Sequence, residues 1–388
     1  MSMIRNVSFF SQVLQQLPRN TFRGHVRDCG TEYNAKGFNS WTHLVSMLFC
    51  HLARAESLRE ICQGLGGMLG KLSHLGVPTA PPKSTLSYAN ANRTSELFKK
   101  FYFSLLDNFR DSGKLFRNRE FRFDAPLKIL DSTMISLCHS AYEWAVYRTG
   151  KGAAKMHVLL DATDVMPDFV HITEGRAHDL VVRDLLKIRE GTIVVFDRGY
   201  NSHGFYDDLT SREVNFVTRM RSNTLYEVIE DRSIPYSINH LITDDQVIRI
   251  TGSGYYFRRV VSIDQETGQE IVILTNLLHF GPTTVSNIYR ARWDIEEFFR
   301  QIKQNLHIRT FVGTSKNAFE IQIWTALIAL LILSWLKHRS RSGWSFSVLA
   351  AMVRFILLSN INLDDWLRDP EGKLLRSSQS DQMSLAFC

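Results

Sequence analysis

Residues 288–306 constrain this chain more than any other stretch, because they read IYRARWDIEEFFRQIKQNL without a proline or glycine. Their apolar residues recur at helical spacing, and seven of them form one series: Ile288, Ala291, Ile295, Phe298, Phe299, Ile302 and Leu306. At about 100° per residue they fall within an arc of roughly 100°. Such an arc is the buried stripe of an amphipathic helix. We therefore expect a single helix here, with this stripe in the core.

Polar residues form a second stripe along one edge of the apolar one. Its members are Tyr289, Arg292, Glu296 and Lys303, which lie within about 60° of one another around the predicted helix. Glu297 points about 100° away from Glu296, so Glu296 is the candidate functional acid. The stripe suits an anionic ligand and a metal ion. A solvated face with i,i+3 and i,i+4 ion pairs is the alternative, and this helix alone favours neither.

Length and charge set broad limits on the rest of the chain. At 388 residues it is long enough for about two or three domains with a large core. The net charge of +7 favours a polyanionic partner, most simply nucleic acid. The five cysteines are scattered, without the spacing of a zinc site. This usage, with no signal-peptide pattern, predicts a cytoplasmic, nucleoid-associated protein.

The first 120 residues are predicted to be mostly helical. Ser40 and Ser57 each precede an apolar run and are candidate N-caps. Residues 84–93 resemble the recognition segment of a helix-turn-helix, although an ordinary capped helix fits them at least as well. Near the other end, residues 321–336 are the most apolar run, but they contain polar residues and are short for a membrane span. We expect a buried core helix there and no membrane contact.

The pattern changes to strands after residue 126. Apolar and β-branched runs predict three strands, a helix, a strand, a helix and a strand, at 127–137, 155–162, 168–173, 179–189, 192–197, 204–210 and 214–218. The order allows an antiparallel meander followed by parallel additions, which makes a mixed sheet of the α/β class. Residues 221–282 contain stretches in which apolar and polar residues alternate, and glycines separate these stretches. This pattern predicts an all-β insertion. Further helices are expected at 318–337 and 345–358.

Two aspartates occupy costly positions in this sheet. Asp131 lies inside the first strand and Asp197 ends the fourth, where a carboxylate is unfavourable unless it is paired or binds a metal. If the two strands are neighbours, the 288–306 helix could bring Glu296 over the same point. Three carboxylates suit Mg²⁺, and two such ions about 4 Å apart can act on a phosphodiester. Alternatively, Asp131 caps a turn and Asp197 caps the following helix.

Together these motifs resemble a known family. The spacing Tyr289-x2-Arg292-x3-Glu296-x6-Lys303, with Asp131-Ser132-Thr133 and Asp197-Arg198-Gly199-Tyr200 upstream, is similar to that of bacterial insertion-sequence transposases of the DDE class with the Tyr-Arg-Glu-Lys signature. The likeness covers roughly residues 121–338. It implies an RNase H-like mixed five-stranded sheet with flanking helices, interrupted by a β-rich insertion domain and preceded by a helical N-terminal domain.

The resemblance also implies domain boundaries. They are a helical domain at 1–120 that is a candidate for binding end DNA, a catalytic domain at 121–221 and 283–345, an insertion at 222–282, and a C-terminal helix and tail at 346–388.

The resemblance further implies roles for individual residues. Asp131, Asp197 and Glu296 would be the metal-binding catalytic triad, with two Mg²⁺ ions that Mn²⁺ can replace. The residues expected to contact DNA are Tyr289, Arg292, Lys303, Arg219, Trp293 and Arg300. Weaker candidates for phosphate contact are Arg198, Lys151 and Lys155. A GxxxxGK[ST] motif is absent, so no nucleotide is expected.

Other residues are less informative. The histidines His157, His171 and His178 are not spaced as metal ligands and are expected to be structural, with His178 capping a helix. Family members that form DNA hairpins stack a flipped base on an aromatic residue of the insertion. Tyr255, Tyr256 and Phe257 are aromatic residues in this region, and the sequence does not choose among them.

We therefore expect a cut-and-paste DNA transposase. It would bind terminal inverted repeats of double-stranded DNA as a homodimer, cleave at the transposon ends through hairpin intermediates and join the 3′-hydroxyls to target DNA. Another RNase H-like nuclease, such as a resolvase, is an alternative against which the Tyr-Arg-Glu-Lys spacing argues. A domesticated non-catalytic DNA-binding regulator is a second alternative, disfavoured by the presence of all three carboxylates.

Overall fold

The computed structural model describes residues 7–372, apart from residues 34, 36, 69–70, 116–120, 138–141, 143, 149–150, 307–310 and 341. The chain divides into two compact units. A helical unit comprises Met1–Phe116 and Arg300–Cys388, and a sheet unit comprises Arg117–Phe299. The helix α9 (Trp293–Asn305) begins in the sheet unit and ends in the helical unit.

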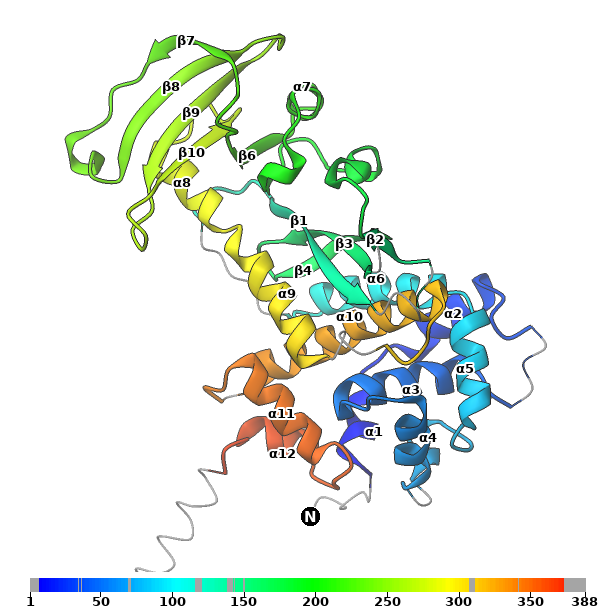
Figure 1. The fold of residues 1–388 in the computed structure, drawn as a ribbon. Helices are drawn as coiled ribbons and strands as arrows, with labels where there is room; N and C mark the ends of the chain where they lie inside the picture. Colours follow the sequence, from blue (N-terminus) through cyan, green and yellow to red (C-terminus); the bar gives the residue numbers. More distant parts are fainter. Residues whose placement is uncertain are drawn as a thin grey trace, which may run out of the picture. The chain divides into compact units, whose positions relative to one another are not determined.

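One long helix, α10 (Lys316–Arg339), is the core of the helical unit. The other helices of this unit are α1 (Phe9–Leu14), α2 (Arg19–Asp28), α3 (Ser40–Ala53), α4 (Leu58–Gly66), η1 (Leu72–Leu75, a 3₁₀ helix), α5 (Lys83–Asn92), α6 (Glu96–Asp111), α11 (Phe346–Ile356) and α12 (Leu363–Arg368). α10 packs against α3, α5, α6 and α11 (Figure 1). By length and composition alone it could span a membrane, but 89% of its most apolar window is buried inside the protein. The predicted core helix at 321–336 is therefore confirmed.

Two helices of this unit show how the chain enters a helix. Ser57 caps α4 as predicted, because its hydroxyl accepts a hydrogen bond from the Glu60 N–H at 3.2 Å. The prediction for Ser40 is wrong by one residue: Asn39 caps α3 and accepts from the Thr42 N–H at 2.7 Å. Asn and Ser are about equally good N-caps, so the sequence could not decide between these neighbours.

The sheet unit contains one mixed sheet of ten described strands, in the order β2-β3-β1-β5-β6-β10-β9-β8-β7, with β4 paired to β3. The strands are β1 (Leu127–Leu137), β2 (Val146–Arg148), β3 (Lys151–Asp161), β4 (Met166–Glu174), β5 (Ile193–Phe196), β6 (Asn215–Arg219), β7 (Tyr226–Asp231), β8 (Ile242–Ile250), β9 (Tyr256–Ile263) and β10 (Glu270–Thr275). β5 is parallel to both β1 and β6. The other described pairs are antiparallel.

Both faces of the central strand β5 are covered. Val194 and Phe196 pack in a cluster with side chains of α7 (His203–Ser211). Ile193 and Val195 pack in a second cluster with side chains of α8 (Pro282–Arg290). A strand buried on both faces is continuously apolar, which explains the run that the sequence shows here.

The sheet is larger than the five strands predicted. Those five correspond to β1, β3, β4, β5 and β6, and β10 then pairs antiparallel with β6, Ile273 opposite Arg219. The strands β7 to β10 therefore continue the sheet (Figure 1). An open edge on β6 would invite pairing with another chain, and β10 covers it.

Two predicted helices differ from the structure. The helix expected at 179–189 is a shorter 3₁₀ helix, η2 (Asp179–Leu185). The single helix expected at 288–306 is divided into α8 and α9 by Ala291 and Arg292. Bonds of the i→i−3 type tighten the backbone there, from Arg292 N to Tyr289 O and from Asp294 N to Ala291 O, each 3.1 Å. The predicted apolar stripe is nevertheless buried along its whole length.

The boundaries of the two compact units differ from those of the predicted domains. Residues from Arg300 onward group with the N-terminal helices, because α10 packs among α3, α5 and α6. The predicted functional domains stay predictions.

Candidate active site

Parallel pairing of β1 and β5 places two aspartates side by side. Leu130 pairs with Phe196 in this register, so the next residues, Asp131 and Asp197, lie at the same level of the sheet. Asp131 lies within β1, opposite Val158 of β3. Asp197 precedes the 3₁₀ helix η3 (Arg198–Tyr200), and its side chain makes no capping hydrogen bond to it. The alternative function of Asp197 as a cap is therefore wrong.

Asp131 is held in a buried, acidic environment. Its side chain is 18% exposed, and the Ser132 N–H donates a hydrogen bond to its Oδ1 at 2.7 Å. Burial raises the pKa of Asp131 to about 6; the Ser132 N–H and Arg292 oppose this rise, and the charges of Asp197 and Glu296 add to it. The three predicted carboxylates therefore act on one another within the sheet unit.

Arg292 connects two of these carboxylates. It lies at the turn between α8 and α9, and its Nη1 is 2.8 Å from Glu296 Oε1 and 3.7 Å from Asp131 Oδ2. Burial lowers the pKa of Arg292, but Tyr289, Glu296 and Asp131 outweigh it and the pKa is raised. The Glu296 side chain is 44% exposed. Arg292 and Glu296, four residues apart, thus form an ion pair at the site.

Two guanidinium groups at the site keep buried donors without a protein partner. They are the Nε groups of Arg219, at the end of β6, and of Arg292. The pKa of the Tyr289 hydroxyl is raised, chiefly by burial. The charges of Arg292 and Arg219 oppose this rise, and the charge of Asp197 adds to it. A buried unsatisfied donor is costly, and an anion such as a phosphate oxygen would satisfy these two.

The remaining predicted DNA contacts lie along α9. Trp293 is 58% exposed, and the guanidinium carbon of Arg292 is 5.4 Å from its ring centroid. Arg300 is exposed and Lys303 is partly buried, and both belong to the part of α9 that groups with the helical unit.

The donor set fits a hard divalent cation only in part. Asp131, Asp197 and Glu296 offer carboxylate oxygens, which Mg²⁺ prefers, and Mg²⁺ is often held by one or two carboxylates plus substrate phosphates. Among the described residues, however, no group of three or more His, Cys, Asp or Glu is placed to hold a metal ion. Arg292 pairs with Asp131 and Glu296. Asp131 and Asp197, which the sheet register sets side by side, are the two carboxylates that could hold a metal ion here.

Several weaker candidates have structural functions. The Lys155 ammonium donates to the Ala177 carbonyl at 2.7 Å and contacts Asp179, so it is engaged within the protein. The side chain of Lys151 lies outside the described residues. His157 bonds to the hydroxyls of Thr173 and Tyr200, and burial lowers its pKa to about 4. His178 caps η2 by accepting from the Leu180 N–H at 3.2 Å. The histidine predictions for His157 and His178 are confirmed.

The β strands after β6 present only some of their aromatic residues. Phe257 is completely buried, whereas Tyr255 and Tyr256 are 37% and 51% exposed. Arg258 is also buried and forms a bidentate pair with Asp245, with both N–O distances 2.7 Å. Of the three aromatics considered from the sequence, the two tyrosines are therefore available to a ligand.

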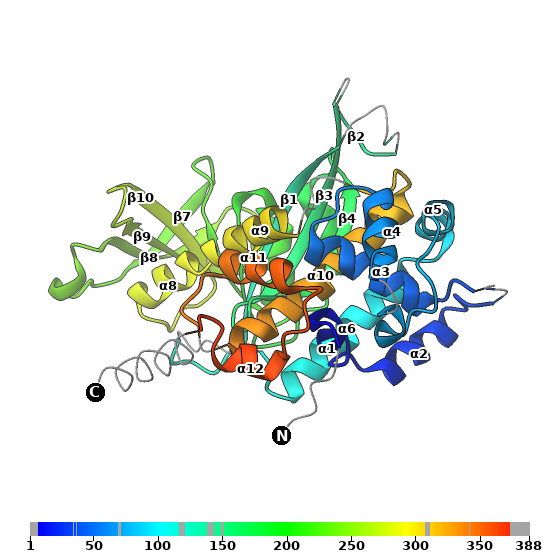
Figure 2. The ribbon, with the colours of Figure 1, turned by 90° about the horizontal axis from the view of Figure 1, so that it is seen from below.

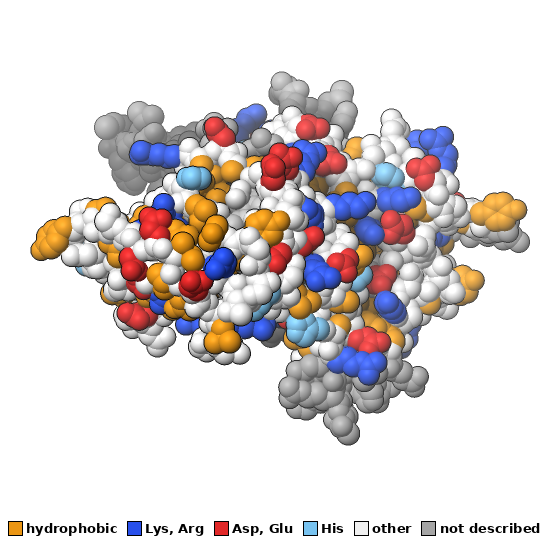
Figure 3. Space-filling model, turned by 90° about the horizontal axis from the view of Figure 1, so that it is seen from above, with side chains coloured by type: hydrophobic (Ala, Val, Ile, Leu, Met, Phe, Trp, Pro, Cys, Tyr) orange, Lys and Arg blue, Asp and Glu red, His pale blue; other side chains and the backbone are white. Residues whose placement is uncertain are grey.

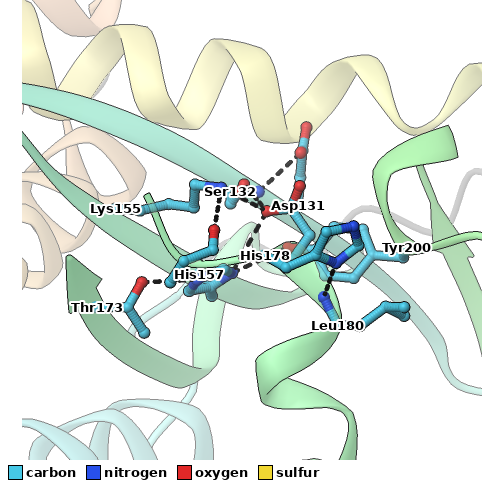
Figure 4. A network of polar contacts seen from close by, with 10 residues as sticks. Asp131, Ser132, Lys155, His157, Thr173, His178, Leu180 and Tyr200 are labelled. Carbon is cyan, nitrogen blue, oxygen red and sulfur yellow. Dashed lines mark hydrogen bonds and ion pairs between the residues drawn. The ribbon is translucent and has the colours of Figure 1, made fainter. Parts of the chain in front are cut away.

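One acidic residue of this region was missed by sequence reasoning. Asp179 directly follows the capping His178, and its sequence position assigns it no function beyond the start of that helix. Its carboxylate instead accepts from the Ser132 hydroxyl at 2.7 Å and lies 3.3 Å from the Lys155 ammonium. Figure 4 shows these two partners, Ser132 and Lys155, in the polar network around Asp131. These contacts join residues far apart in the sequence, and nothing in the local pattern signals them.

With this geometry in place, comparison with known proteins identifies the class. Residues 122–332 match the family described as "Transposase DDE domain", and residues 5–78 match a domain of unknown function, DUF4372. The chain belongs to the DDE transposase family. It is a DNA transposase of the bacterial insertion-sequence type, an enzyme class that cleaves DNA and transfers strands.

Similar proteins carry transposase names. The chain is 31% identical to y4zB of Sinorhizobium fredii over 66% of this chain and 72% of that protein. It is 29% identical to a transposase of element IS5377 from Geobacillus stearothermophilus, over 61% of this chain and 64% of that protein. A piggyBac transposase complex with hairpin DNA, solved by cryo-EM, has a TM-score of 0.45 at 10% identity, covering 98% of this chain and 86% of that chain. A likeness at that level supports no statement about this chain.

Proposed function

We propose that Asp131, Asp197 and Glu296 are the catalytic carboxylates of a cut-and-paste reaction at transposon terminal inverted repeats. The register that places Leu130 opposite Phe196 carries this proposal, because it sets Asp131 beside Asp197. The charge of Glu296 reaches the same point. All three lie within the residues that match the transposase family.

The strand arrangement supports an RNase H-like core. β1 has an antiparallel neighbour, β3, which pairs in turn with β4, and on its other side lie two parallel strands, β5 and β6. In this proposal the strands β7 to β10 are the β-rich insertion, between β6 and the α8–α9 region that carries Glu296.

The metal in this proposal is Mg²⁺, with two ions in the active complex and Mn²⁺ as a substitute. Asp131 and Asp197 would hold it, and Glu296 would join them once Arg292 has an alternative anionic partner. When bound, the metal supplies Lewis-acid polarisation of the scissile phosphodiester and neutralises charge on its oxygens.

The protein's own side chains would position the DNA. Arg292 and Arg219 each keep a buried Nε–H that a phosphate oxygen can accept, and a guanidinium binds phosphate through a planar fork. Tyr289 lies beside Arg292, and the exposed Trp293 offers a stacking surface. Lys303 and Arg300 would extend this contact along the same helix.

The rest of the proposal concerns the assembly. The protein would act in the bacterial cytoplasm as a homodimer on double-stranded DNA, form hairpin ends and join the 3′-hydroxyls to target DNA. The exposed Tyr255 and Tyr256 are the candidates to stack a flipped base. Acidic and basic side chains are interspersed on the face in Figure 3, so DNA contact there would need local clusters of cations.

The test is cleavage of a labelled fragment that carries the DNA flanking the gene, with Mg²⁺ or with EDTA. We expect metal-dependent nicking at a repeat boundary, followed by a hairpin-sized product. D131N, D197N and E296Q should each lose on the order of 10³-fold in rate or more while still binding the ends. E297Q is the matched control, since Glu297 lies next to Glu296 on α9. Near wild-type cleavage by any of the three variants would overturn the assignment of that residue, and open ends in place of hairpins would overturn the hairpin route.

A further inference from the structure

Asp179 is a fourth carboxylate near the site. It is the first residue of η2, outside the two strands that carry Asp131 and Asp197, and its side chain is 24% exposed. A first-turn acid usually interacts with the N-terminal N–H groups of its own helix. Here His178 already provides the cap, and the Asp179 carboxylate accepts a hydrogen bond from Ser132 of β1 instead.

The first set of contacts joins Asp179 to β1. The Ser132 hydroxyl donates to Asp179 Oδ1 at 2.7 Å, while the backbone N–H of the same serine donates to Asp131 Oδ1 at 2.7 Å. Ser132 therefore bonds to both carboxylates, one through its side chain and one through its main chain. Fixing the serine side chain fixes the peptide that orients the Asp131 carboxylate.

The second set joins Asp179 to the segment that follows Asp197. A Cβ added to Gly199 would lie 2.7 Å from Asp179 Oδ2, a distance that real Cβ atoms do not tolerate without a shift. The glycine thus lets the carboxylate approach the turn Arg198–Tyr200 closely. η2 and η3 are packed neighbours, so Asp179 touches the elements of both aspartates.

Surrounding groups make this arrangement stable. The Lys155 ammonium lies 3.3 Å from Asp179 Oδ1 and compensates its charge. His157 Nδ1 is 3.8 Å from the same oxygen and 3.3 Å from the Tyr200 hydroxyl. A half-buried carboxylate with a cation and a hydroxyl donor is a well-satisfied group. These contacts come from β1, β3 and the turn after Asp197, so Asp179 links all three.

We propose that Asp179 is a positioning residue for the transposase reaction: it holds β1 beyond Asp131 and the turn beyond Asp197 at a fixed separation. This inference rests on the proposed function of Asp131 and Asp197. Residues that orient metal ligands without touching the metal typically change metal affinity or activity by about 10–100-fold when they are replaced. We expect an effect of that size from Asp179.

The experiment compares D179A, D179N, S132A and the double variant D179A/S132A with wild type. D184A is the matched control, because Asp184 lies on the same 3₁₀ helix and is 81% exposed. Four quantities are measured: cleavage rate against Mg²⁺ concentration, binding of Mn²⁺ to the DNA-free protein by electron paramagnetic resonance, binding to end DNA by gel shift, and the unfolding temperature.

For D179A we expect a loss of about 10–100-fold in rate and weaker Mn²⁺ binding, with end binding unchanged. D179N keeps an oxygen acceptor for Ser132 and should fall between D179A and wild type. The double variant should be little worse than D179A alone, because Ser132 and Asp179 act through one hydrogen bond.

Several outcomes would overturn the proposal. Unchanged Mn²⁺ binding and rate in D179A would do so, as would a loss that follows only the unfolding temperature or end binding. If D131N and D197N also cleaved normally, the proposed function itself would fail. If those two lost cleavage and D179A did not, only this further inference would fail.

A second variant gives an independent check that does not depend on removing a charge. G199A places a methyl group against Asp179 Oδ2, so it should reduce Mn²⁺ binding in the wild-type background. In the D179A background the carboxylate is gone and the Cβ of residue 179 lies 3.8 Å from the added methyl, an ordinary van der Waals contact, so G199A should then add little. If G199A reduced Mn²⁺ binding equally in both backgrounds, the effect would not arise from contact between Asp179 and this turn.

Discussion

At the scale of single residues, the site balances acids against one guanidinium. Asp131 is buried and its pKa is raised to about 6, with the charges of Asp197 and Glu296 adding to the rise. Arg292 offsets part of this by pairing with Asp131 and Glu296. A cation bound at Asp131 and Asp197 would neutralise the acids, and a phosphate bound at Arg292 would replace its carboxylate partners. In the DNA-free protein these side chains pair with one another. In the proposed complex the same side chains would bind the metal and the phosphate.

His43 makes a prediction about pH that is independent of the site. It is fully buried in the helical unit, with Nε2 2.6 Å from Asn90 Oδ1. Burial, aided by the charge of Arg93, lowers its pKa from 6.5 to about 3. The unfolded chain therefore binds the extra proton between these values. The stability that neutral His43 contributes is complete above pH 6.5 and decreases as the pH falls toward 3, by about 2 kcal/mol at pH 5.

Thermal unfolding of wild type and H43Q at pH 7.5 and pH 5 tests this prediction. H43Q should be less stable at pH 7.5, yet lose less on acidification. His157, whose pKa burial lowers to about 4, acts in the same direction, so the drop should become smaller without vanishing. An identical drop in both proteins would contradict the assignment to His43.

The sequence revealed residues whose chemistry is costly where they stand. Asp131 and Asp197 were recognisable because a carboxylate interrupts or ends an apolar strand, and Glu296 because it repeats with Tyr289 and Arg292 around a helix. Asp179 was not recognisable, since its partners are Ser132 and Lys155, distant in sequence. Local pattern predicts which residues are unusual, and only the sheet register shows which of them meet.

At the scale of elements, the prediction of strand β1 was accurate, and that of a single helix at 288–306 was not. The bounds of β1 match the prediction, Leu127–Leu137, because apolar and β-branched residues run between clear breaks. The break between α8 and α9 was missed, because neither proline nor glycine marks it. Arg292 lies at that turn and binds Asp131 and Glu296, which are tertiary contacts that no local propensity encodes.

Helix α2 carries three arginines that are candidates to contact phosphates, if residues 1–120 bind the transposon ends as proposed. Arg19, Arg23 and Arg27 repeat every fourth residue, so they lie within about 80° on one side. They line a hollow of about 570 Å³ together with Trp41. Burial, and secondarily the charge of Arg23, lower the pKa of Arg19. Such a row of cations matches a DNA backbone.

We expect R23A and R27A each to weaken binding to end DNA and to non-specific DNA alike, and to reduce the salt slope of log K by about one per residue. Arg19 is left unchanged, because it bonds to the Leu75 carbonyl and stacks on Trp41. K100A, an exposed lysine of α6, is the control. Gel shifts over a range of salt concentrations provide the measurement. If K100A reduced the slope as much as R23A and R27A, α2 would not be a specific contact.

At the scale of the whole molecule, the two ends of the chain belong to the same helical unit. The Phe9 and Phe10 N–H groups donate to the carbonyls of Ser359 and Leu357, each at 2.8 Å. The Phe9 ring meets Trp366 of α12 edge to face, with centroids 5.2 Å apart. Figure 2 shows α1 beside α12. Helix α1 therefore packs against residues encoded about 350 positions later.

This arrangement changes what the predicted domain at 1–120 can do alone. Its helices α3, α5 and α6 bury their apolar faces against α10, and His51 is bonded at 3.0 Å to both Leu306 O and Thr325 Oγ1. Removing α10 would expose a large apolar surface, whose burial is worth about 25 cal/mol per Å². It would also leave the buried polar groups that face α10 without partners, at about 1–3 kcal/mol each.

We therefore expect a fragment of residues 1–120 to lack a cooperative thermal transition and to bind a hydrophobic dye, as a loosely packed state does. Co-expression with residues 300–388 should restore a cooperative transition and abolish dye binding, because α10 to α12 then complete the core. Circular dichroism and dye fluorescence on the separate and combined fragments measure this. A cooperative transition for the 1–120 fragment alone would show that it is an autonomous domain after all. In that case the helices after Arg300 would be a cover added to a domain that folds without them, and the domain boundaries predicted from the sequence would be the better description.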